Sequence, residues 1–290
     1  MLSAFFIRLG IGIFSAIPFS LMYVLSDFLY FMMKNVVKYR KKVIWNNLKN
    51  SFPDKSDLEL TQIMNDAYKN LCDVTLEGFK GLSMSAVELK RRYKVINPAL
   101  ALQDFERGKS VILTGSHFTN WEWGVIGWSL WFEHQVVGIY KPLSNKEVEA
   151  VLNEKRAAFG MSLAAPSETR AALERHKIEP CMYVLMGDQS PSNLKSAHWL
   201  SFLNQETAWL HGVGSIANNY DFPIYYLDTQ RVARGFYEST LTLLCPNPKD
   251  FSPEEISTLY AAKVEAIILK KPGDWLWSHK RWKHKKMLDC

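Results

Sequence analysis

The stretch VILTGSHFTNWE, residues 111–122, runs from four apolar residues into a polar segment that contains His117 and Glu122. A short apolar run bounded by turn-forming residues is typical of a buried strand. A histidine just past such a strand, with a carboxylate five positions on, is well placed to be a general base whose tautomer the carboxylate fixes. Positions i and i+5 of a helix point apart, so the two side chains meet only if a turn separates them, which Gly115 and the polar run to Asn120 permit. The simpler alternative is a histidine that only satisfies buried polar groups.

The rest of the chain alternates strand-like and helical stretches. A capped helix is expected from Ser144, with Glu147, to Gly160, and another starts at Ser252. Such alternation predicts an α/β fold, a mixed central sheet flanked by helices, with the site at the carboxyl ends of the strands. The expected buried strands are residues 110–114, 135–140, 181–186 and 223–231.

The amino-terminal segment, residues 9–33, is the most apolar, and Asp27 is its only formal charge. Its length of roughly 25 residues suffices for a tilted helix across a bilayer of about 30 Å. We therefore expect a membrane anchor helix over residues 1–34, which Pro18 could kink so that it dips into one leaflet instead of spanning. A signal peptide and a buried core helix are the alternatives.

A basic cluster that includes Arg40, Lys41 and Lys42 follows this segment. Such clusters stay on the cytoplasmic side and attract anionic headgroups. The sequence thus predicts a protein of the inner (cytoplasmic) membrane, attached to an anionic surface with its catalytic body in the cytosol.

Two helices, residues 56–80 with a Ser56/Glu59 capping box and residues 83–93, come next. No Gly- or Ser-rich linker divides the chain, so residues 35–290 are expected to form one domain with a helical lead-in over 35–100.

The composition favours acidic partners and gives no sign of a metal site. Lys and Arg number 35 against 29 Asp and Glu, a net charge of +6. The four cysteines lie far apart without metal-ligand spacing, so we expect reduced, structural thiols and neither a metal nor an organic cofactor. These cysteines are Cys72, Cys181, Cys245 and Cys290.

Five sequence blocks in order resemble the late acyltransferases of lipid A biosynthesis, the lauroyl and myristoyl transferases of the lysophospholipid acyltransferase superfamily. One of these blocks precedes the His-x4-Glu motif, and four follow it. Besides His117 and Glu122, the matching residues are Tyr39, Arg40, Asn47, Leu48, Phe52 and Pro53; Tyr140, Lys141 and Pro142, with Arg156 and Gly160 in the helix behind them; Asp188 and Gln189; and Trp275, Trp277, His279, Arg281 and Trp282.

The chain departs from this family pattern at three places. Lys141 stands where the family has Arg, residues 190–192 read Ser-Pro-Ser where a Gly is usual, and residues 212–214 read Gly-Val-Gly where Gly-x-Glu is common. The last two positions are expected near the substrates, so the reaction type is better supported than the substrate.

The resemblance implies transfer of a fatty acyl chain from an acyl carrier protein thioester to a hydroxyl of a lipid A precursor, which is a phosphorylated glycolipid. His117 would be the base and Glu122 would stabilise its imidazolium. A carboxylate such as Asp188, just past a buried strand, usually orients another group. The expected substrate-binding residues are Asn120, Lys141, Arg156, Asp188 and Gln189.

The carboxyl-terminal stretch DWLWSHKRWKHKK interleaves aromatic and basic residues. Membrane headgroups explain it better than nucleic acid, which is not expected as a partner. The side chains expected at headgroups here are Trp275, Trp277, Arg281 and Trp282.

Two other functions remain open from sequence. The enzyme could acylate another lipid, such as a lysophospholipid or an aminolipid, and few cations around the site would favour that. Alternatively, the protein could be a silent lipid-binding protein, with His117 and Glu122 too far apart to bond and no acyl-sized groove.

Overall fold

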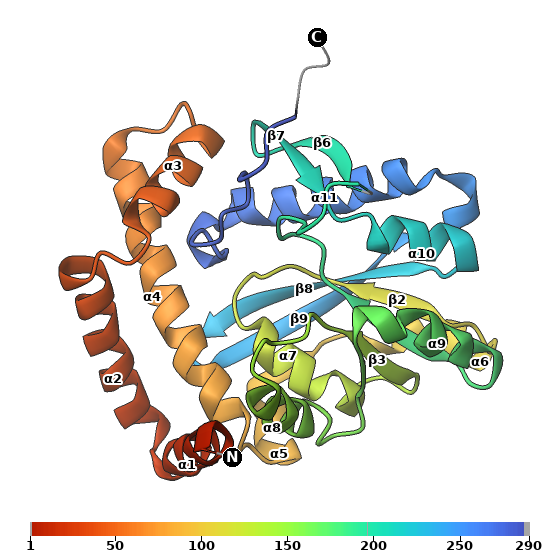
Figure 1. Ribbon diagram of the computed structural model, residues 1–290, viewed down its shortest axis with the longest axis horizontal. Coiled ribbons are helices and arrows are strands. Elements are labelled where there is room, and N and C mark those ends of the chain that lie inside the picture. Colours follow the sequence, from red (N-terminus) through yellow and green to blue (C-terminus); the bar gives the residue numbers. More distant parts are fainter. Residues whose placement is uncertain (1, 196, 287–290) are drawn as a thin grey trace.

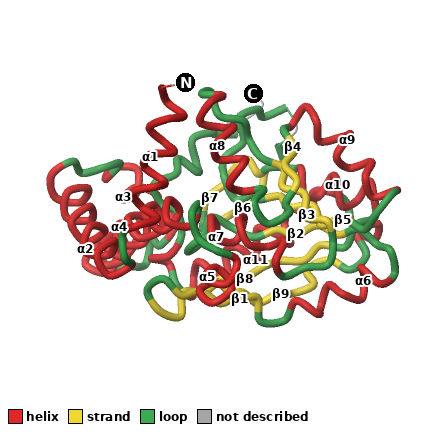
Figure 2. Tube along the Cα trace, turned by 90° about the horizontal axis from the view of Figure 1, so that it is seen from below, coloured by secondary structure: helices red, strands yellow, loops and turns green. Residues whose placement is uncertain are grey.

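The computed structural model describes residues 2–195 and 197–286, and within them a mixed seven-stranded sheet has the order β1-β9-β8-β2-β5-β3-β4 (Figures 1 and 2). Strands β2, β3, β4, β5 and β8 are parallel, whereas β9 pairs antiparallel with β8 and parallel with β1. The expected α/β fold with a mixed central sheet is confirmed. The strands are β1 (Tyr93–Val95), β2 (Val111–Thr114), β3 (Gln135–Ile139), β4 (Ser162–Ala164), β5 (Cys181–Leu185), β8 (Ile224–Ala233) and β9 (Phe236–Cys245), and β6 (His198–Phe202) and β7 (Gln205–Trp209) form a separate hairpin.

The central strand β2 is buried on both faces, as its unbroken apolar run predicts. Ile112 belongs to the core cluster beneath α10 and α11, whereas Val111 and Leu113 belong to the cluster that includes Trp123 and Trp128. Because successive strand residues point to opposite faces, one short run contributes to both cores.

Helices α10 and α11 cover one face of the sheet, and α5 and α7 cover the other, while α1 to α4 stand together at one end (Figure 1). The predicted Ser56 and Ser252 capping boxes are both present, at the starts of α4 and α11. Helix α8 begins later than expected, because Asn145, not Ser144, accepts the first amides. The helices are α1 (Leu2–Ala16), α2 (Phe19–Phe31), α3 (Lys41–Ser51), α4 (Asp57–Gly81), α5 (Ala86–Arg92), α6 (Leu102–Glu106), α7 (Trp121–Gly127), α8 (Lys146–Arg156), α9 (Thr169–Leu173), α10 (Gly212–Tyr220) and α11 (Pro253–Lys270).

The apolar amino-terminal segment is a bent pair of helices, not the one anchor helix that we expected. Helix α1 ends at Ala16, α2 begins at Phe19, and a π-helical turn, Met32–Val36, follows α2. In the described part of the chain no single helix is long and apolar enough to cross a membrane. The pair Phe5–Ala16 and Phe19–Val36, bent by 119°, is long and apolar enough when its two helices are taken together. Pro18 explains the break, because proline has no N–H and disfavours helical geometry at the residue before it.

Helices α10 and α11 approach each other closely at Gly214. A Cβ added there would lie 2.3 Å from the Pro253 carbonyl oxygen, whereas one added at Gly212 would lie no closer than 3.7 Å, from Leu185. The Gly-Val-Gly departure from the family pattern therefore includes one glycine that packing requires.

We predict that Gly214→Ala lowers the free energy of unfolding by about 1–3 kcal/mol, because the helices must separate. The measurement is the midpoint of thermal or urea unfolding. Gly212→Ala, the matched control, should leave the midpoint unchanged or raise it, since alanine favours helix. Equal midpoints for the two variants would contradict the packing argument.

Candidate active site

The loop between β2 and α7 carries His117 and is held by the carboxyl-terminal segment of the chain. Phe118 forms an antiparallel bridge with Trp275, the Thr119 amide donates to the Asp274 carbonyl at 2.8 Å, and the Leu276 amide donates to the His117 carbonyl at 3.2 Å. Thr119 adopts a φ of 50°, in the left-handed region. The backbone from His117 to Thr119 is thus fixed by its pairing with residues 274–276.

The His117 ring is bonded to Asp188, which lies just past β5. Strands β2 and β5 are neighbours and parallel, so their carboxyl ends meet at one edge of the sheet. His117 Nδ1 lies 2.6 Å from Asp188 Oδ1, and the His117 amide donates to Oδ2 at 2.8 Å. Trp275 Nε1 also donates to Oδ2, at 3.0 Å. The carboxylate therefore fixes the ring, the backbone and the indole together.

Electrostatics in this cluster favour the charged forms of both partners. Burial opposes the charge on His117, but the charge and hydrogen bond of Asp188, with a further contribution from Glu122, raise the pKa of His117 above its ordinary value. Burial likewise opposes ionisation of Asp188, yet the His117 charge and the hydrogen bonds from His117 and Trp275 lower the pKa of that carboxyl. Asp188 is thus an anion at neutral pH, ready to accept Nδ1–H.

The other ring nitrogen is available for chemistry. Nε2 of His117 makes no hydrogen bond to any residue in 2–195 or 197–286, and the side chain is 17% exposed. With the proton on Nδ1, a neutral imidazole presents an electron pair at Nε2. The Trp121 ring lies edge-on beside it, with centroids 5.1 Å apart.

Glu122 does not make the expected hydrogen bond to His117 among the described residues. It lies in the first turn of α7, and its Oε2 accepts instead from Arg156 Nη2 at 3.1 Å, from α8. Its influence on His117 is therefore one of charge. The prediction that Glu122 fixes the tautomer is corrected: Asp188 already holds Nδ1.

The other residues expected to bind substrate, Asn120, Lys141 and Gln189, differ in burial and in hydrogen bonding. Asn120 is fully buried, caps α7 by accepting from the Trp123 amide, and donates to Glu77 at 2.7 Å. Lys141 donates to Ser192 at 3.1 Å, in the loop behind Asp188. Gln189 is partly buried.

Burial corrects the expectation that Trp275, Trp277 and Arg281 meet lipid headgroups. Each is at most 3% exposed. Trp277 Nε1 donates to the Pro272 carbonyl, and Arg281 Nη1 donates to Thr207 and the Ala208 carbonyl, whereas Arg281 Nε and Nη2 are buried without a partner among the described residues. Trp282 remains partly exposed.

The basic segment that follows α2 is hydrogen-bonded to the carboxyl-terminal segment. Arg40 donates to the Ser278 carbonyl at 3.0 Å, and Asn47 donates to the carbonyls of Trp277 and His279. Lys41 and Lys42 are exposed. Two sequence blocks at opposite ends of the chain thus meet, and the second of them holds the His117 loop.

Two small apolar cavities flank the motif. One is lined by Ser116, Met186 and Tyr226 among others, the other by Val74 and Leu276 among others, and each measures about 10 Å³. Trp121 borders both. Each is about the size of one water molecule, so neither accommodates an acyl chain as it stands.

A larger groove of about 620 Å³ lies between α3, the β6–β7 turn and the carboxyl-terminal tail. It is lined by Val43, Asn46, Asn47, Asn50, Gln205, Glu206, Lys280, Trp282, Lys283, His284, Lys285 and Lys286. Among the described residues that line it, the lysines outnumber the one carboxylate, Glu206, so an acidic partner fits it best.

The described residues contain no group of three or more His, Cys, Asp or Glu placed to hold a metal ion. Cys72, Cys181 and Cys245 are buried free thiols, and Cys290 lies outside the described residues.

The profile of the bacterial lipid A biosynthesis acyltransferase family matches residues 1–284. The chain belongs to this family. The resemblance seen in the five blocks is thereby confirmed, and the protein is an acyltransferase. No curated protein sequence matches the chain.

We predict that the pH dependence of kcat/KM distinguishes the role of Asp188 from that of Glu122. A base must be neutral, so kcat/KM should fall as pH drops through the raised pKa of His117. Asp188→Asn should move that acid limb to lower pH and cut the plateau by about 10²–10⁴-fold, because the tautomer is no longer fixed. Glu122→Gln should move the limb in the same direction but less. An acid limb that Asp188→Asn leaves in place would contradict the assignment.

Proposed function

We propose that the protein transfers a fatty acyl chain from an acyl carrier protein thioester to a hydroxyl of a lipid A precursor, with His117 as general base. One observation carries this proposal: Nδ1 of His117 is held by a buried carboxylate, while the side chain is partly exposed and Nε2 has no hydrogen-bond partner in the described residues. An alcohol is too weak an acid to attack a thioester unaided at neutral pH. An imidazole with a fixed tautomer meets that need.

In the proposed reaction, the acceptor hydroxyl oxygen attacks the thioester carbonyl carbon as Nε2 takes the hydroxyl proton. The C–S bond then breaks, the carrier thiolate leaves, and a proton from the imidazolium neutralises it. Asp188 stabilises the imidazolium during this cycle, since it keeps its charge in a buried position.

Glu122 and Arg156 act together in this proposal. Their pairing brings a guanidinium next to the motif, and Arg156 Nε is buried without a partner among the described residues. A fixed cation with an unused N–H suits the oxyanion of the tetrahedral intermediate or a phosphate of the acceptor. Glu122 holds that cation and adds negative charge near His117.

The donor and the membrane both fit the charge distribution. An acyl carrier protein is acidic, so we place its docking site at the groove that contains Lys280, Lys283 and Lys285. The exposed apolar residues of α1 and α2, followed by the exposed Lys41 and Lys42, support attachment to an anionic membrane, the inner membrane, from its cytoplasmic side.

The acyl chain needs more room than the cavities beside His117, so Trp121, which borders both, would turn aside when the donor binds.

The other acceptors, a lysophospholipid or an aminolipid, use the same chemistry. Arg156, which pairs with Glu122, and Lys141, which bonds to the loop behind Asp188, are cations that support a phosphorylated acceptor. The family, which is one of lipid A biosynthesis, favours the lipid A precursor among such acceptors.

The test uses purified protein with a labelled acyl carrier protein thioester and either a lipid A precursor or a lysophospholipid. We expect label on the lipid A precursor, and a loss of about 10²–10⁴-fold in kcat for His117→Ala. His176→Gln is the matched control, because His176 precedes β5 at the opposite edge of the sheet and should leave the rate unchanged.

Label on the lysophospholipid alone would keep the mechanism and change the substrate. Transfer to neither acceptor, with folded protein, would favour a silent lipid-binding protein, as would full activity of His117→Ala.

A further inference from the structure

Helices α1 and α2 carry many apolar side chains that the rest of the described protein leaves exposed. Both helices pack on the body of the domain with their other sides, α2 on α4 and α1 on α8 and α4. The exposed apolar side chains are Phe5, Phe6, Leu9, Ile13, Leu21, Val24, Leu25, Phe28 and Phe31, and Val36 and Val37 continue them beyond α2. Basic residues follow at once, with Lys38 and Lys41 exposed. Apolar surface bordered by cations matches hydrocarbon bordered by anionic headgroups.

The turn between the two helices is fixed by a lysine of α4. Lys80 Nζ donates to the carbonyls of Phe14, Ser15 and Ile17 at 2.7–2.8 Å. These are acceptors that the end of α1 leaves without helical partners. A cation at a helix carboxyl terminus is also favourable for the helix dipole. Three carbonyls at the bend are therefore bonded from within the protein.

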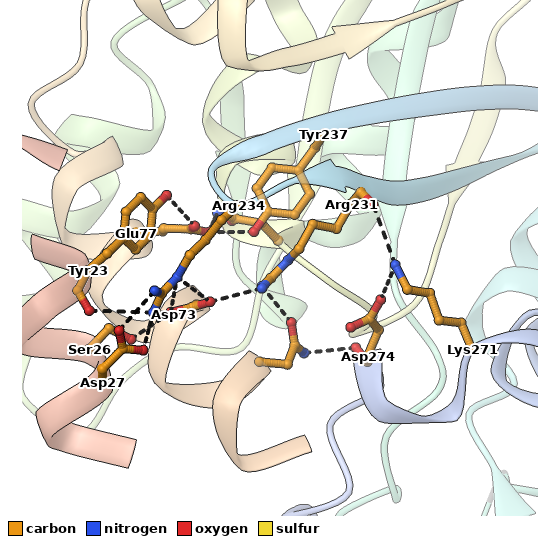
Figure 3. Close-up of polar contacts among 12 residues, drawn as sticks. Tyr23, Ser26, Asp27, Asp73, Glu77, Arg231, Arg234, Tyr237, Lys271 and Asp274 are labelled. Carbon is orange, nitrogen blue, oxygen red and sulfur yellow. Dashed lines mark hydrogen bonds and ion pairs between the residues drawn. The ribbon is translucent and has the colours of Figure 1, made fainter. Parts of the chain in front are cut away.

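Helix α2 is joined to the domain by charged and polar groups along one side (Figure 3). Ser26 donates to the buried Asp73 at 2.6 Å, and Tyr23 donates to Glu77 at 2.8 Å. Asp27 pairs at 2.7 Å with Arg234, from the turn between β8 and β9.

These contacts belong to one network centred on Asp73. Arg234 also pairs with Asp73 at 2.6 Å, and Arg231 pairs with it at 2.9 Å. Arg231 is bonded in turn to Asn70, which donates to the Asp274 carbonyl next to the His117 loop. Detaching α2 would remove the Ser26 and Tyr23 hydroxyl donors from the buried carboxylates of Asp73 and Glu77, and a lost hydrogen bond to a buried charged group is costly.

We infer that α1 and α2 form a re-entrant hairpin that enters only the leaflet facing the catalytic body. If α2 crossed the bilayer with these contacts intact, Asp73 and the two arginines of the β8–β9 hairpin would lie at hydrocarbon depth, where charges are strongly disfavoured. With the hairpin in one leaflet, its exposed side contacts acyl chains and its bonded side stays with the protein. This inference deepens the proposed membrane attachment and rests on it.

The hairpin also connects lipid to the candidate site. Arg8 of α1 pairs with Glu154 of α8 at 2.6 Å, and Arg156, which holds Glu122, lies on the same helix. A lipid acceptor in that leaflet would therefore approach the site along α1 and α8 without leaving the membrane.

The test is cysteine labelling of the full chain in sealed inner-membrane vesicles of both orientations, with a membrane-impermeant maleimide. Cys290→Ser removes the one cysteine outside the described residues, and the other three are buried. Ser3→Cys reports the start of α1, and Asn35→Cys, beyond α2, is the matched control.

We expect both cysteines to react only from the cytoplasmic side. Protection of Ser3→Cys from both sides until detergent is added also supports the inference, because it places the end within the near leaflet. Labelling of Ser3→Cys from the periplasmic side, with Asn35→Cys labelled from the cytoplasmic side, would overturn it. Protein that does not sediment with membranes would instead refute the proposed attachment itself, and the inference with it.

A second measurement is independent of labelling. Arg8→Cys with Glu154→Cys, treated with a short bifunctional maleimide in intact membranes, should give an intramolecular cross-link by peptide mass spectrometry. Each single variant is the control. Absence of the cross-link in membrane-bound protein would show that α1 leaves α8 and would overturn the hairpin.

Discussion

The buried carboxylate of Asp188 is the interaction on which the site depends. It accepts from the His117 ring, the His117 amide and the Trp275 indole, and it is 1% exposed. A buried anion is tolerated only when its oxygens are satisfied, so these donors stabilise Asp188 as much as Asp188 orients them. The strand order makes the arrangement possible, since β2 and β5 deliver His117 and Asp188 to one edge of the sheet.

The carboxyl-terminal segment connects this centre to the rest of the protein. Trp275 reaches Asp188, the Leu276 amide holds the His117 carbonyl, and the carbonyls of Trp277 and Ser278 accept from Asn47 and Arg40. Burial lowers the pKa of His279 to about 4, so it stays neutral and accepts from the Ser190 amide just behind Asp188. Trp275 and Trp277, which suggest a lipid interface by composition, are therefore buried residues that support the site.

The sequence predicts local features well and tertiary pairing poorly. Apolar runs located β2, β3, β5 and β8, and Ser-x-x-Glu patterns located the starts of α4 and α11, because both signals depend on neighbouring residues. The alternating strand β9 and the hairpin β6–β7 were not predicted. The His117–Asp188 bond joins residues 71 positions apart, and nothing in one sequence encodes which carboxylate reaches the ring. Pro18 predicts a break, but Lys80, far along the chain, holds the bend.

The central claim is that Asp188 fixes His117 with its proton on Nδ1 and leaves Nε2 as the base. The most direct test is the ¹⁵N chemical shifts of the His117 ring in protein labelled on histidine, recorded above the pKa of the ring. The account predicts a protonated Nδ1 and an unprotonated Nε2 in the wild type, and a loss of that preference in Asp188→Asn. A neutral wild-type ring with its proton on Nε2 would contradict it, because such a ring could not take a proton from the acceptor.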